Sequence, residues 1–428
     1  MSSVKIPQIS ELPEFPDAES LISFLEKQVE GPCGVLEYIL ADPFKEFPDF
    51  DGKVFIAETL PKLRQLILSR EPDFLKDIPF LDESAEKLEF TRKQVLTLLG
   101  FMFFCLLKAH QTEYAQQYRR LDFRMWYLCN GPPLRDDIPR AGYIKSLLYY
   151  FHLACSHWNE SILNESIVFQ RFSLKEIVDY FNITTAVDNE AAIESVTVSE
   201  RISDSPGLTV ETNFANRQIG FGDTATQEEI LFGMSPEMSV ATLFTTPLGD
   251  RETVLISGAK KICCSTGYWN RLEVFPWKSC LTDPTRHILC IDAVDFDSPS
   301  IFIKYKCSGE AVDMLKLQLR SEFLIRELNK LVIGFSVCPP DLPIATGKWG
   351  CGAFGGSFEL KVILQILAAM KTKRRLRLCL FGDETAPELI RTLSQDYLKG
   401  KSIGSVVQEL TNPESDLVKF LFESLKQD

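Results

Sequence analysis

Residues 345–357 read Ala-Thr-Gly-Lys-Trp-Gly-Cys-Gly-Ala-Phe-Gly-Gly-Ser, and this density of glycine is hard to explain as an ordinary loop. It carries five glycines and runs directly into a strongly apolar helical pattern from Phe358 to Met370. Glycine lets the backbone approach a ligand closely, and the N-terminus of a helix favours a phosphate group. We therefore expect this turn to hold an anionic ligand at the start of a helix.

Two common nucleotide-binding motifs fit this turn poorly. The P-loop pattern Gly-x4-Gly-Lys-Ser/Thr is absent from the sequence. The residues from Gly350 to Gly355 match Gly-x-Gly-x-x-Gly, but Pro339, Pro340 and Pro343 precede them where a dinucleotide-binding unit needs a strand. The pattern therefore disfavours both a nucleoside triphosphate and NAD.

A second turn lies within residues 213–230, where Gly220 and Gly222 lead to Thr226 and then to Gln-Glu-Glu. Thr226 is suited to cap a helix, and acidic residues in a first turn complement the helix dipole. Spacing alone favours that structural interpretation of Glu228 and Glu229. A chemical role for the pair is the alternative.

A third turn, residues 265–269, reads Ser-Thr-Gly-Tyr-Trp. Its aromatic side chains suit stacking on a base or covering a sugar, and a core position for Trp269 is equally compatible with the pattern.

The hydrophobic pattern predicts a largely helical first half. Residues 57–181 have helical apolar spacing, and the segment from Thr91 to Gln94 has the form of a capping box before an apolar run from Val95 to Leu107. A second apolar stripe runs from Ile144 to Trp158. His152 and His157 lie on it, and a packed or surface role is favoured over a catalytic one.

The second half predicts alternating strands and helices. Strands are expected at Ile193–Val198, Thr209–Glu211, Met238–Phe244, Thr253–Ile256, His287–Ile291 and Leu376–Phe381, and helices at Met314–Leu331, Phe358–Met370 and Ser405–Leu425. We predict an irregular segment over residues 1–50, a helical domain over 51–190 and an α/β domain over 191–428.

The composition sets limits on partners and location. The chain has 46 Lys+Arg against 59 Asp+Glu, a net charge of −13, which argues against broad nucleic-acid binding. The first residues lack the apolar core of a signal peptide, and the longest apolar run is too short to span a bilayer. The twelve cysteines have no metal-ligand spacing. We expect an intracellular protein with reduced, mostly buried cysteines and no membrane partner.

The three turns in this order, followed by Phe381-Gly382-Asp383, resemble the poly(ADP-ribose) glycohydrolase family across about residues 50–385. The resemblance implies a macrodomain-like α/β core, a mixed sheet flanked by helices, with an N-terminal helical accessory domain. It implies hydrolysis of the ribose–ribose O-glycosidic bonds of poly(ADP-ribose), without a cofactor or a metal. The expected partners are poly(ADP-ribose) or ADP-ribosylated proteins, with no sequence-specific nucleic acid, and the expected protein is a monomer in the nucleus or cytoplasm.

The resemblance also assigns roles to individual residues. It implies that Glu229 is the catalytic acid and base and that Glu228 binds ribose hydroxyls. The remaining implied substrate-binding residues are Ile202 beside the adenine, Asn216, Gly220, Gly222, Gln227, Tyr268 over the bound ADP-ribose, Lys348, Gly350, Gly352, Ala353, Phe354 and Gly355 around the diphosphate, and Phe381 near the ribose or base.

The chain departs from the family pattern at several positions. The family has three successive glycines and a longer connection before Gln-Glu-Glu, whereas Gly220-Phe221-Gly222 is followed here by only four residues. A phenylalanine should hinder the approach of the backbone to a diphosphate unless its ring turns away. Lys348, Ser203 and Asn213 replace the family's asparagine, acid and aspartate, and Lys348 could add a charge-assisted bond to phosphate.

Three interpretations of function therefore remain. The retained Glu228 and Glu229 favour an enzyme acting on the polymer. The short connection favours a protein that binds ADP-ribose with little turnover. A hydrolase for single ADP-ribose groups is the third. The basic run Lys371-Thr372-Lys373-Arg374-Arg375 suits a nuclear import signal, but a solvated edge before a strand is favoured.

Overall fold

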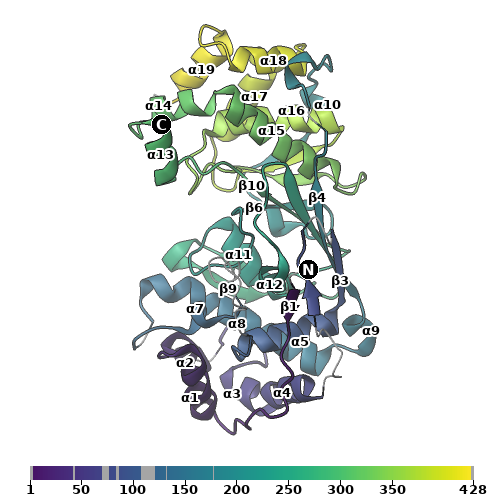
Figure 1. Cartoon of the computed structure of the whole chain (residues 1–428), viewed down its shortest axis with the longest axis vertical. Helices are drawn as coiled ribbons and strands as arrows, with labels where there is room; N and C mark the ends of the chain where they lie inside the picture. The colour runs from purple at the N-terminus through teal and green to yellow at the C-terminus, as the bar shows by residue number, and fades with distance from the viewer. Residues whose placement is uncertain are drawn as a thin grey trace. The chain divides into compact units, whose positions relative to one another are not determined.

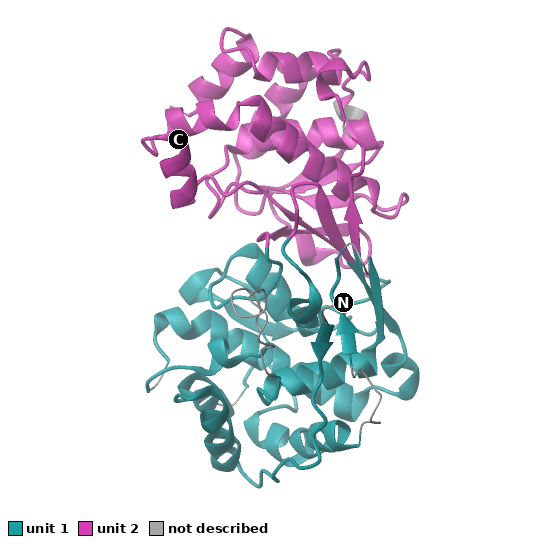
Figure 2. Ribbon diagram, viewed as in Figure 1, with its two compact units in different colours: residues 1–170, 218–247, 256–285 teal, residues 171–217, 248–255, 286–428 magenta. Residues whose placement is uncertain are grey.

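The computed structural model describes residues 3–41, 44–69, 77–82, 86–107, 121–131, 133–176 and 178–425 of the chain (Figure 1). The chain divides into two compact units, each assembled from separate stretches of sequence (Figure 2). Unit 1 contains Met1–Gln170, Gln218–Pro247 and Ile256–Thr285. Unit 2 contains Arg171–Arg217, Leu248–Leu255 and Arg286–Asp428. The domain boundaries expected from the sequence stay a prediction.

Unit 1 is mainly helical. Its helices are α1 (Ala18–Val29), α2 (Gly34–Ala41), α3 (Gly52–Val54), α4 (Leu60–Leu68), α5 (Arg92–Phe103), α7 (Arg124–Tyr127), α8 (Ile138–His152), α9 (Glu160–Leu163), α11 (Gln227–Met234) and α12 (Ala241–Phe244). Two π-helical turns, Phe55–Thr59 and Leu153–His157, precede α4 and follow α8. The strands are β1 (Ser3–Lys5) with β2 (Asp77–Pro79), β8 (Cys263–Thr266) with β9 (Glu273–Pro276), and β3 (Lys87–Thr91) with the first residues of β4 (Ser166–Ser173).

Helix α5 lies at the centre of unit 1, as the sequence predicts. The amide of Gln94 donates to Oγ1 of Thr91 (3.2 Å), and the amide of Thr91 donates to Oε1 of Gln94 (2.7 Å), so the expected capping box is confirmed. Every residue from Val95 to Phe103 is buried. The helix ends there, and Cys105 adopts a left-handed backbone with φ 53°.

Two sequence predictions are wrong in unit 1. Strands β3 and β4 lie inside the region predicted to be helical, because their side chains alternate between buried and exposed positions over only five and eight residues. Residues 238–244 were expected as a strand, but they form a 3-10 turn (Pro236–Val240) and α12. Pro236 at the first helical position fixes a helical φ, and the whole segment is buried, so its β-branched residues carry no alternation.

Unit 2 is built around a sheet of largely parallel strands. The order is β4, β7 (Glu252–Ser257), β10 (His287–Asp292), β6 (Val210–Ala215), β11 (Ile344–Thr346), β12 (Leu376–Cys379) and β5 (Ile193–Thr197), with β4 and β7 divided by the unit boundary. The helices are α10 (Asn189–Ala192), α13 (Pro299–Tyr305), α14 (Ala311–Gln318), α15 (Ser321–Ser336), α16 (Phe358–Thr372), α17 (Ala386–Thr392), α18 (Ile403–Leu410) and α19 (Asp416–Ser424).

The five strands from β10 to β5 all run in the same direction, because each neighbouring pair is parallel. The carboxyl ends of β6, β11, β12 and β5 therefore meet at one edge of the sheet. Ligands of parallel α/β sheets bind at that edge. The sheet thus carries the loops that follow Ala215, Thr346, Cys379 and Thr197 to a common side of unit 2.

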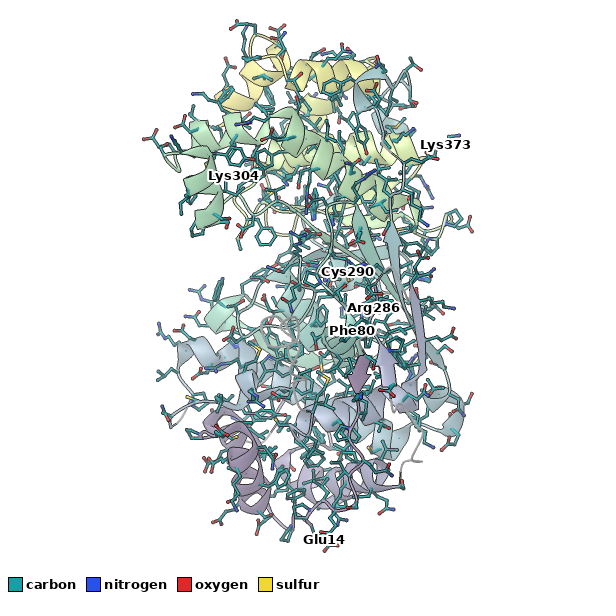
Figure 3. The ribbon with its side chains drawn as sticks, viewed as in Figure 1. Glu14, Phe80, Arg286, Cys290, Lys304 and Lys373 are labelled. Carbon is teal, nitrogen blue, oxygen red and sulfur yellow. The ribbon has the colours of Figure 1, made fainter. Side chains whose placement is uncertain are left out.

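A buried ion pair fixes the start of two central strands. The guanidinium of Arg286, just before β10, binds the carboxylate of Glu211 on β6 through two hydrogen bonds of 2.5 and 2.7 Å. Both side chains are almost completely buried. Figure 3 labels Arg286 together with Cys290, which lies further along β10. Two parallel bonds between planar groups fix both distance and orientation, so the pair sets the register of the strands.

Two helix predictions in unit 2 need correction. The pattern from Met314 to Leu331 is divided between α14 and α15, because Arg320 has an extended ψ of 138° and begins the second helix. The C-terminal helical region is likewise divided into α18 and α19, with Pro413 between them.

The basic run after α16 is only partly at the surface. Arg374 is buried and donates to the carbonyl oxygen of Leu342 at 3.0 Å and to that of Pro339. Arg375 pairs with Glu194. Lys373, labelled in Figure 3, ends the helix with a left-handed φ of 56°. Arg374 therefore has a structural role, because its buried guanidinium binds the loop that contains Pro339 and Leu342.

Candidate active site

The acidic pair predicted from the sequence begins helix α11 in unit 1. The carboxylate of Glu229 accepts a hydrogen bond from the amide of Thr226 (3.0 Å) and another from its hydroxyl. This is the glutamate half of a capping box, and it holds the side chain over the N-terminus of the helix. Glu229 is partly exposed and forms no ion pair among the described residues. The carboxylate is therefore oriented by Thr226 in a side chain that is only partly buried.

Glu228 lies on the other side of the same turn and is buried. The amide of Gly220 donates to its Oε1 at 3.2 Å. The two neighbouring carboxylates thus have different surroundings, since Glu228 holds the start of the loop from Ile219 to Thr226 and Glu229 faces its end. We call residues 219–226 the catalytic loop, because they lead to the candidate acid Glu229.

Gly222 lies directly against Glu229. A Cβ atom on Gly222 would lie 2.5 Å from Oε1 and 2.7 Å from Cγ of Glu229, so it would force the Glu229 side chain to shift. A Cβ atom on Gly220 would similarly lie 2.6 Å from Cγ2 of Thr242. Glycine at both positions therefore lets the catalytic loop pack closely against its own helix and its neighbour.

The ring of Phe221 turns away from the loop backbone. It is completely buried, with its centroid 5.0 Å from those of both Phe123 and Trp126. The ring is therefore not exposed beside the loop, because it enters an aromatic cluster that includes α7.

The glycine-rich turn of unit 2 connects β11 to α16, between a strand and a helix as the sequence predicts. Trp349 is fully buried, and its indole nitrogen donates to the carbonyl oxygen of Ile291 at 3.1 Å. The amide of Phe296 donates to the carbonyl oxygen of Phe354 at 2.9 Å. The turn is thus fixed to β10 and to the segment that follows it.

The glycines of this turn have different functions. Gly350 and Gly355 have φ values of +74° and +63°, which only glycine adopts easily. Around Gly352 the situation differs, since a Cβ atom there would meet nothing within 4 Å. The amides of Gly352, Ala353 and Phe354 have no acceptor within the described part of the chain. The exposed part of the turn therefore offers backbone donors and open space, as an anion requires.

A buried charge cluster lies beneath the turn. Lys361 in α16 pairs with Glu327 in α15, and its Nζ lies 4.5 Å from the centroid of Trp349. Burial raises the pKa of Glu327, but the positive charges of Lys361 and Arg326 outweigh that effect and leave the pKa below its ordinary value. Glu327 therefore stays ionised and holds Lys361 next to the backbone of Gly350.

Other predicted ligand residues of unit 2 follow the same strand ends. Asn216 follows β6 and is exposed, and Ile202 packs with Ala345, Cys379 and Phe214. Half of Phe381 is exposed, and the guanidinium of Arg201 lies 4.8 Å from its centroid. Lys348 pairs with Asp383 at 2.6 Å.

The structure brings the predicted residues together in two sets. In unit 1, Gly220, Gly222, Gln227, Glu228 and Glu229 share the catalytic loop and the start of α11. Tyr268 belongs to the same unit, exposed beside Trp269, which is also exposed and has φ 52°, so the core position for Trp269 is wrong. The second set, in unit 2, contains Ile202, Asn216, Lys348, Gly350, Gly352, Ala353, Phe354, Gly355 and Phe381.

Two of the positions that depart from the family pattern have known places in the fold. Asn213 is buried in β6 and donates from Nδ2 to the sulfur of Cys290 (3.6 Å). Ser203 lies in a short 3-10 turn, Ile202–Asp204.

Sequence reasoning missed the residues that hold the catalytic loop. The indole nitrogen of Trp126 in α7 donates to the carbonyl oxygen of Gly222 at 2.7 Å, and the hydroxyl of Tyr143 in α8 donates to that of Thr224 at 2.7 Å. About eighty to a hundred residues separate the partners in sequence, so no local pattern reports these contacts.

His152 and His157 have the packed and surface roles that the sequence favours. Nδ1 of His152 is 3.1 Å from the hydroxyl of Thr59, and its Nε2 is 2.9 Å from Nε2 of His157. His152 is buried, whereas His157 is exposed.

No group of three or more His, Cys, Asp or Glu side chains that could hold a metal ion occurs in the part of the chain that is described. In the same residues no helix has the length and apolar character needed to cross a membrane. All twelve cysteines are free, and six of them are buried.

The parallel sheet with its glycine-rich turn, accompanied by a helical region, defines a protein of the macrodomain class. Residues 183–388 match the family model described as poly(ADP-ribose) glycohydrolase, macro domain fold, and residues 49–171 match the model for the helical domain of the same family. The chain belongs to the poly(ADP-ribose) glycohydrolase family.

Named relatives agree with this assignment. The chain is 28% identical over 257 residues to poly(ADP-ribose) glycohydrolase 2 of Caenorhabditis elegans, covering 55% of this chain and 51% of that protein. It is 31% identical over 230 residues to poly(ADP-ribose) glycohydrolase 1 of the same organism, covering 50% and 28%. The match to probable poly(ADP-ribose) glycohydrolase 2 of Arabidopsis thaliana is 23% identical over 445 residues and covers 86% and 81%. The chain thus spans about half or less of the two nematode relatives.

Among solved structures, the crystal structure of poly(ADP-ribose) glycohydrolase from Deinococcus radiodurans in complex with ADP-ribose is similar, with 13% identity and a TM-score of 0.30, covering 54% of this chain and 95% of that one.

Proposed function

We propose that this protein hydrolyses the ribose–ribose O-glycosidic bonds of poly(ADP-ribose) and releases ADP-ribose, with Glu229 as general acid and base. The observation that carries the proposal is the position of Glu229. Its carboxylate is oriented by Thr226 and packs against the backbone of Gly222, and the residue is partly exposed. Membership of the glycohydrolase family supports the substrate class.

Glycoside hydrolysis suits a carboxyl group in such a position. The leaving ribose oxygen must receive a proton while positive charge develops at the anomeric carbon. In the proposed reaction Glu229 gives its proton to that oxygen as the C–O bond breaks. The resulting carboxylate then takes a proton from water, whose hydroxyl oxygen bonds to the anomeric carbon. One water molecule is consumed in each cycle, and Glu229 is protonated again at the end.

The ligand roles of the other residues belong to the same proposal. Glu228 would bind ribose hydroxyls, with Gln227, Asn216 and Tyr268 orienting the sugar. The amides of Gly352, Ala353 and Phe354, which have no acceptor among the described residues, suit the diphosphate. Ile202 and Phe381 would border the adenine and its ribose. We also propose that the protein acts as a monomer in the nucleus or cytoplasm on the polymer or on ADP-ribosylated proteins.

The test is the substitution Glu229→Gln, which keeps the shape of the side chain and removes its acid. Turnover of labelled poly(ADP-ribose) should fall by about 100-fold or more. Binding of ADP-ribose, measured by calorimetry, should change little. The matched control is Glu273→Gln, on β9 at the surface of the same unit. Full turnover by the Glu229→Gln protein would remove Glu229 from the mechanism.

A second candidate is a binding protein for ADP-ribose with little turnover. It is favoured by the two hydrogen bonds from Thr226, since a carboxylate engaged in capping its helix is less free to reach a substrate. Wild-type protein that binds ADP-ribose but releases none from the polymer would establish this alternative. Comparing the polymer with a singly modified protein as substrate separates the remaining interpretation, a hydrolase for single ADP-ribose groups.

A further inference from the structure

Two side chains of the helical region hydrogen-bond to backbone carbonyl groups of the catalytic loop that lie two residues apart. Trp126 donates to the carbonyl oxygen of Gly222 and Tyr143 donates to that of Thr224, both at 2.7 Å. The side chains of Trp126 and Tyr143 are fully buried, and the bond from Trp126 to Gly222 is buried as well. A buried hydrogen bond of this length has a narrow range of favourable geometry. The backbone between Gly222 and Thr224 is therefore fixed from outside the loop.

Ring packing supports the same short segment. Phe221 is buried against both Phe123 and Trp126, and the rings of those two residues stack with centroids 4.7 Å apart. The ring of Trp126 thus packs against Phe221 while its nitrogen binds the next residue. A side chain that makes both contacts restrains rotation as well as translation of the loop.

Tyr143 contacts the helix of Glu229 as well as the loop. A Cβ atom on Gly233, in the last turn of α11, would lie 2.1 Å from the Tyr143 ring, so the ring lies flush with the helix backbone. Burial raises the pKa of Tyr143, and the charges of Glu229 and Asp223 raise it further. The phenol therefore remains a neutral donor throughout the physiological range.

Trp126 acts on Glu229 through Gly222, which contacts both residues. Trp126 fixes the carbonyl oxygen of Gly222, and the α-carbon of the same residue faces the carboxylate of Glu229, where no Cβ would fit. A shift of Gly222 toward Glu229 would displace the carboxylate, and a shift away would leave it held by Thr226 alone. Catalytic groups need positions fixed to within about 0.5 Å.

We propose that Trp126 and Tyr143 are positioning residues that hold Glu229 in its catalytic orientation through the catalytic loop. The proposal rests on the proposed role of Glu229. The connection between Gly222 and Gln227 contains only four residues, and the two side chains supply from the helical region the rigidity that this connection needs. Neither residue touches the substrate.

The test uses Trp126→Phe and Tyr143→Phe, which remove the donors and keep the rings. The matched controls are Trp158→Phe and Tyr127→Phe. Trp158 is a buried indole whose nitrogen has no partner among the described residues, and the Tyr127 hydroxyl donates to the carbonyl oxygen of Phe103 at 3.0 Å. Each test variant should lower kcat for poly(ADP-ribose) by about 10- to 100-fold, since a displacement near 1 Å costs about 100-fold. KM and the Kd of ADP-ribose should change less than about twofold, and both controls should keep kcat.

A second measurement separates positioning from general destabilisation. Trp126→Phe and Tyr143→Phe are each combined with Glu229→Gln, and residual cleavage is followed with enzyme in excess of substrate. Each change should then have little further effect, because it acts through the carboxyl group that is already gone.

The two proposals fail in different ways. If Glu229→Gln abolishes turnover but Trp126→Phe and Tyr143→Phe match their controls in kcat, only the positioning role is wrong. The positioning role is also wrong if Trp126→Phe and Tyr143→Phe lower cleavage by the same factor whether residue 229 is Glu or Gln. If Glu229→Gln retains full turnover, the proposed function itself is wrong.

Discussion

Lys348 and Asp383 join two turns that follow neighbouring strands, with 2.6 Å between Nζ and Oδ2. Lys348 belongs to the glycine-rich turn after β11, and Asp383 follows Phe381 after β12. Partial burial raises the pKa of Asp383, but the hydrogen bonds from Lys348 and Thr385 outweigh that effect and leave the pKa below its ordinary value. The ammonium group is thus held at the edge of the turn proposed to bind a diphosphate.

The first prediction concerns the charge of Lys348. In Lys348→Gln the affinity for ADP-ribose should fall by about 5- to 20-fold, because a charge-assisted bond to phosphate is lost. The free energy of unfolding should change by less than about 1 kcal/mol, since the pair is partly exposed. Calorimetric titration and urea unfolding measure the two effects. Lys316→Gln, in an exposed pair on α14, is the control, and equal affinities of the two variants would contradict a role for Lys348.

The second prediction concerns the open space at Gly352. Gly352→Ala should leave the free energy of unfolding unchanged or slightly increased, because the new methyl group meets nothing within 4 Å and φ is not positive. Affinity for ADP-ribose should fall by about tenfold or more if the diphosphate fills that space. Gly350→Ala is the contrasting variant. It should lose stability, since φ is +74° and the added atom would lie 2.5 Å from Cβ of Ala293. Undiminished binding by Gly352→Ala would exclude this turn as the phosphate site.

The third prediction concerns the buried pair of Glu211 and Arg286. Glu211→Gln should lower the free energy of unfolding by about 3 to 5 kcal/mol, because it leaves a buried guanidinium without its counter-charge. Glu322→Gln, in an exposed pair with Arg320, should cost less than about 1 kcal/mol. Denaturant unfolding gives both values. Similar costs for the two substitutions would show that the buried pair does not hold the strands.

The fourth prediction concerns pH. Burial lowers the pKa of His152, and the nearby His157 and Lys62 lower it further against the opposing charge of Glu58. The unfolded chain, with an ordinary pKa of about 6.5, then binds more protons than the folded chain as pH falls below that value. The free energy of unfolding should therefore decrease as the pH falls from 7.5 to 5.5.

Urea unfolding at those two pH values checks this sign. His152→Gln should show a smaller decrease than the wild type. Part of the decrease should remain, since burial also lowers the pKa of His287. An unchanged decrease in His152→Gln would mean that other groups cause the pH dependence.

Local sequence was sufficient for elements whose signal lies within a few residues. The capping residues Thr91 and Gln94, the glycines before α16 and the acidic start of α11 all act over one helical turn, so their spacing alone predicts them. The prediction of secondary structure was wrong where a segment is completely buried, because its hydrophobic pattern then no longer distinguishes a strand from a helix. Residues 238–244 read as a strand, yet complete burial and Pro236 make them helical.

The resemblance of the sequence motifs to a known family implied the macrodomain class and the family. Glycine, capping and acidic residues constrain the backbone next to them, so their spacing predicted where the candidate acid and the glycine-rich turn lie. Where the Phe221 ring points, and what holds the loop before Glu229, depend on tertiary packing and could not be predicted. Trp126 and Tyr143 contact the loop across gaps of 96 and 81 residues, and packing between such distant segments leaves no trace in local spacing. From the sequence, the Phe221 ring is expected to obstruct the loop. In the structure it holds the loop instead, because it packs against Phe123 and Trp126.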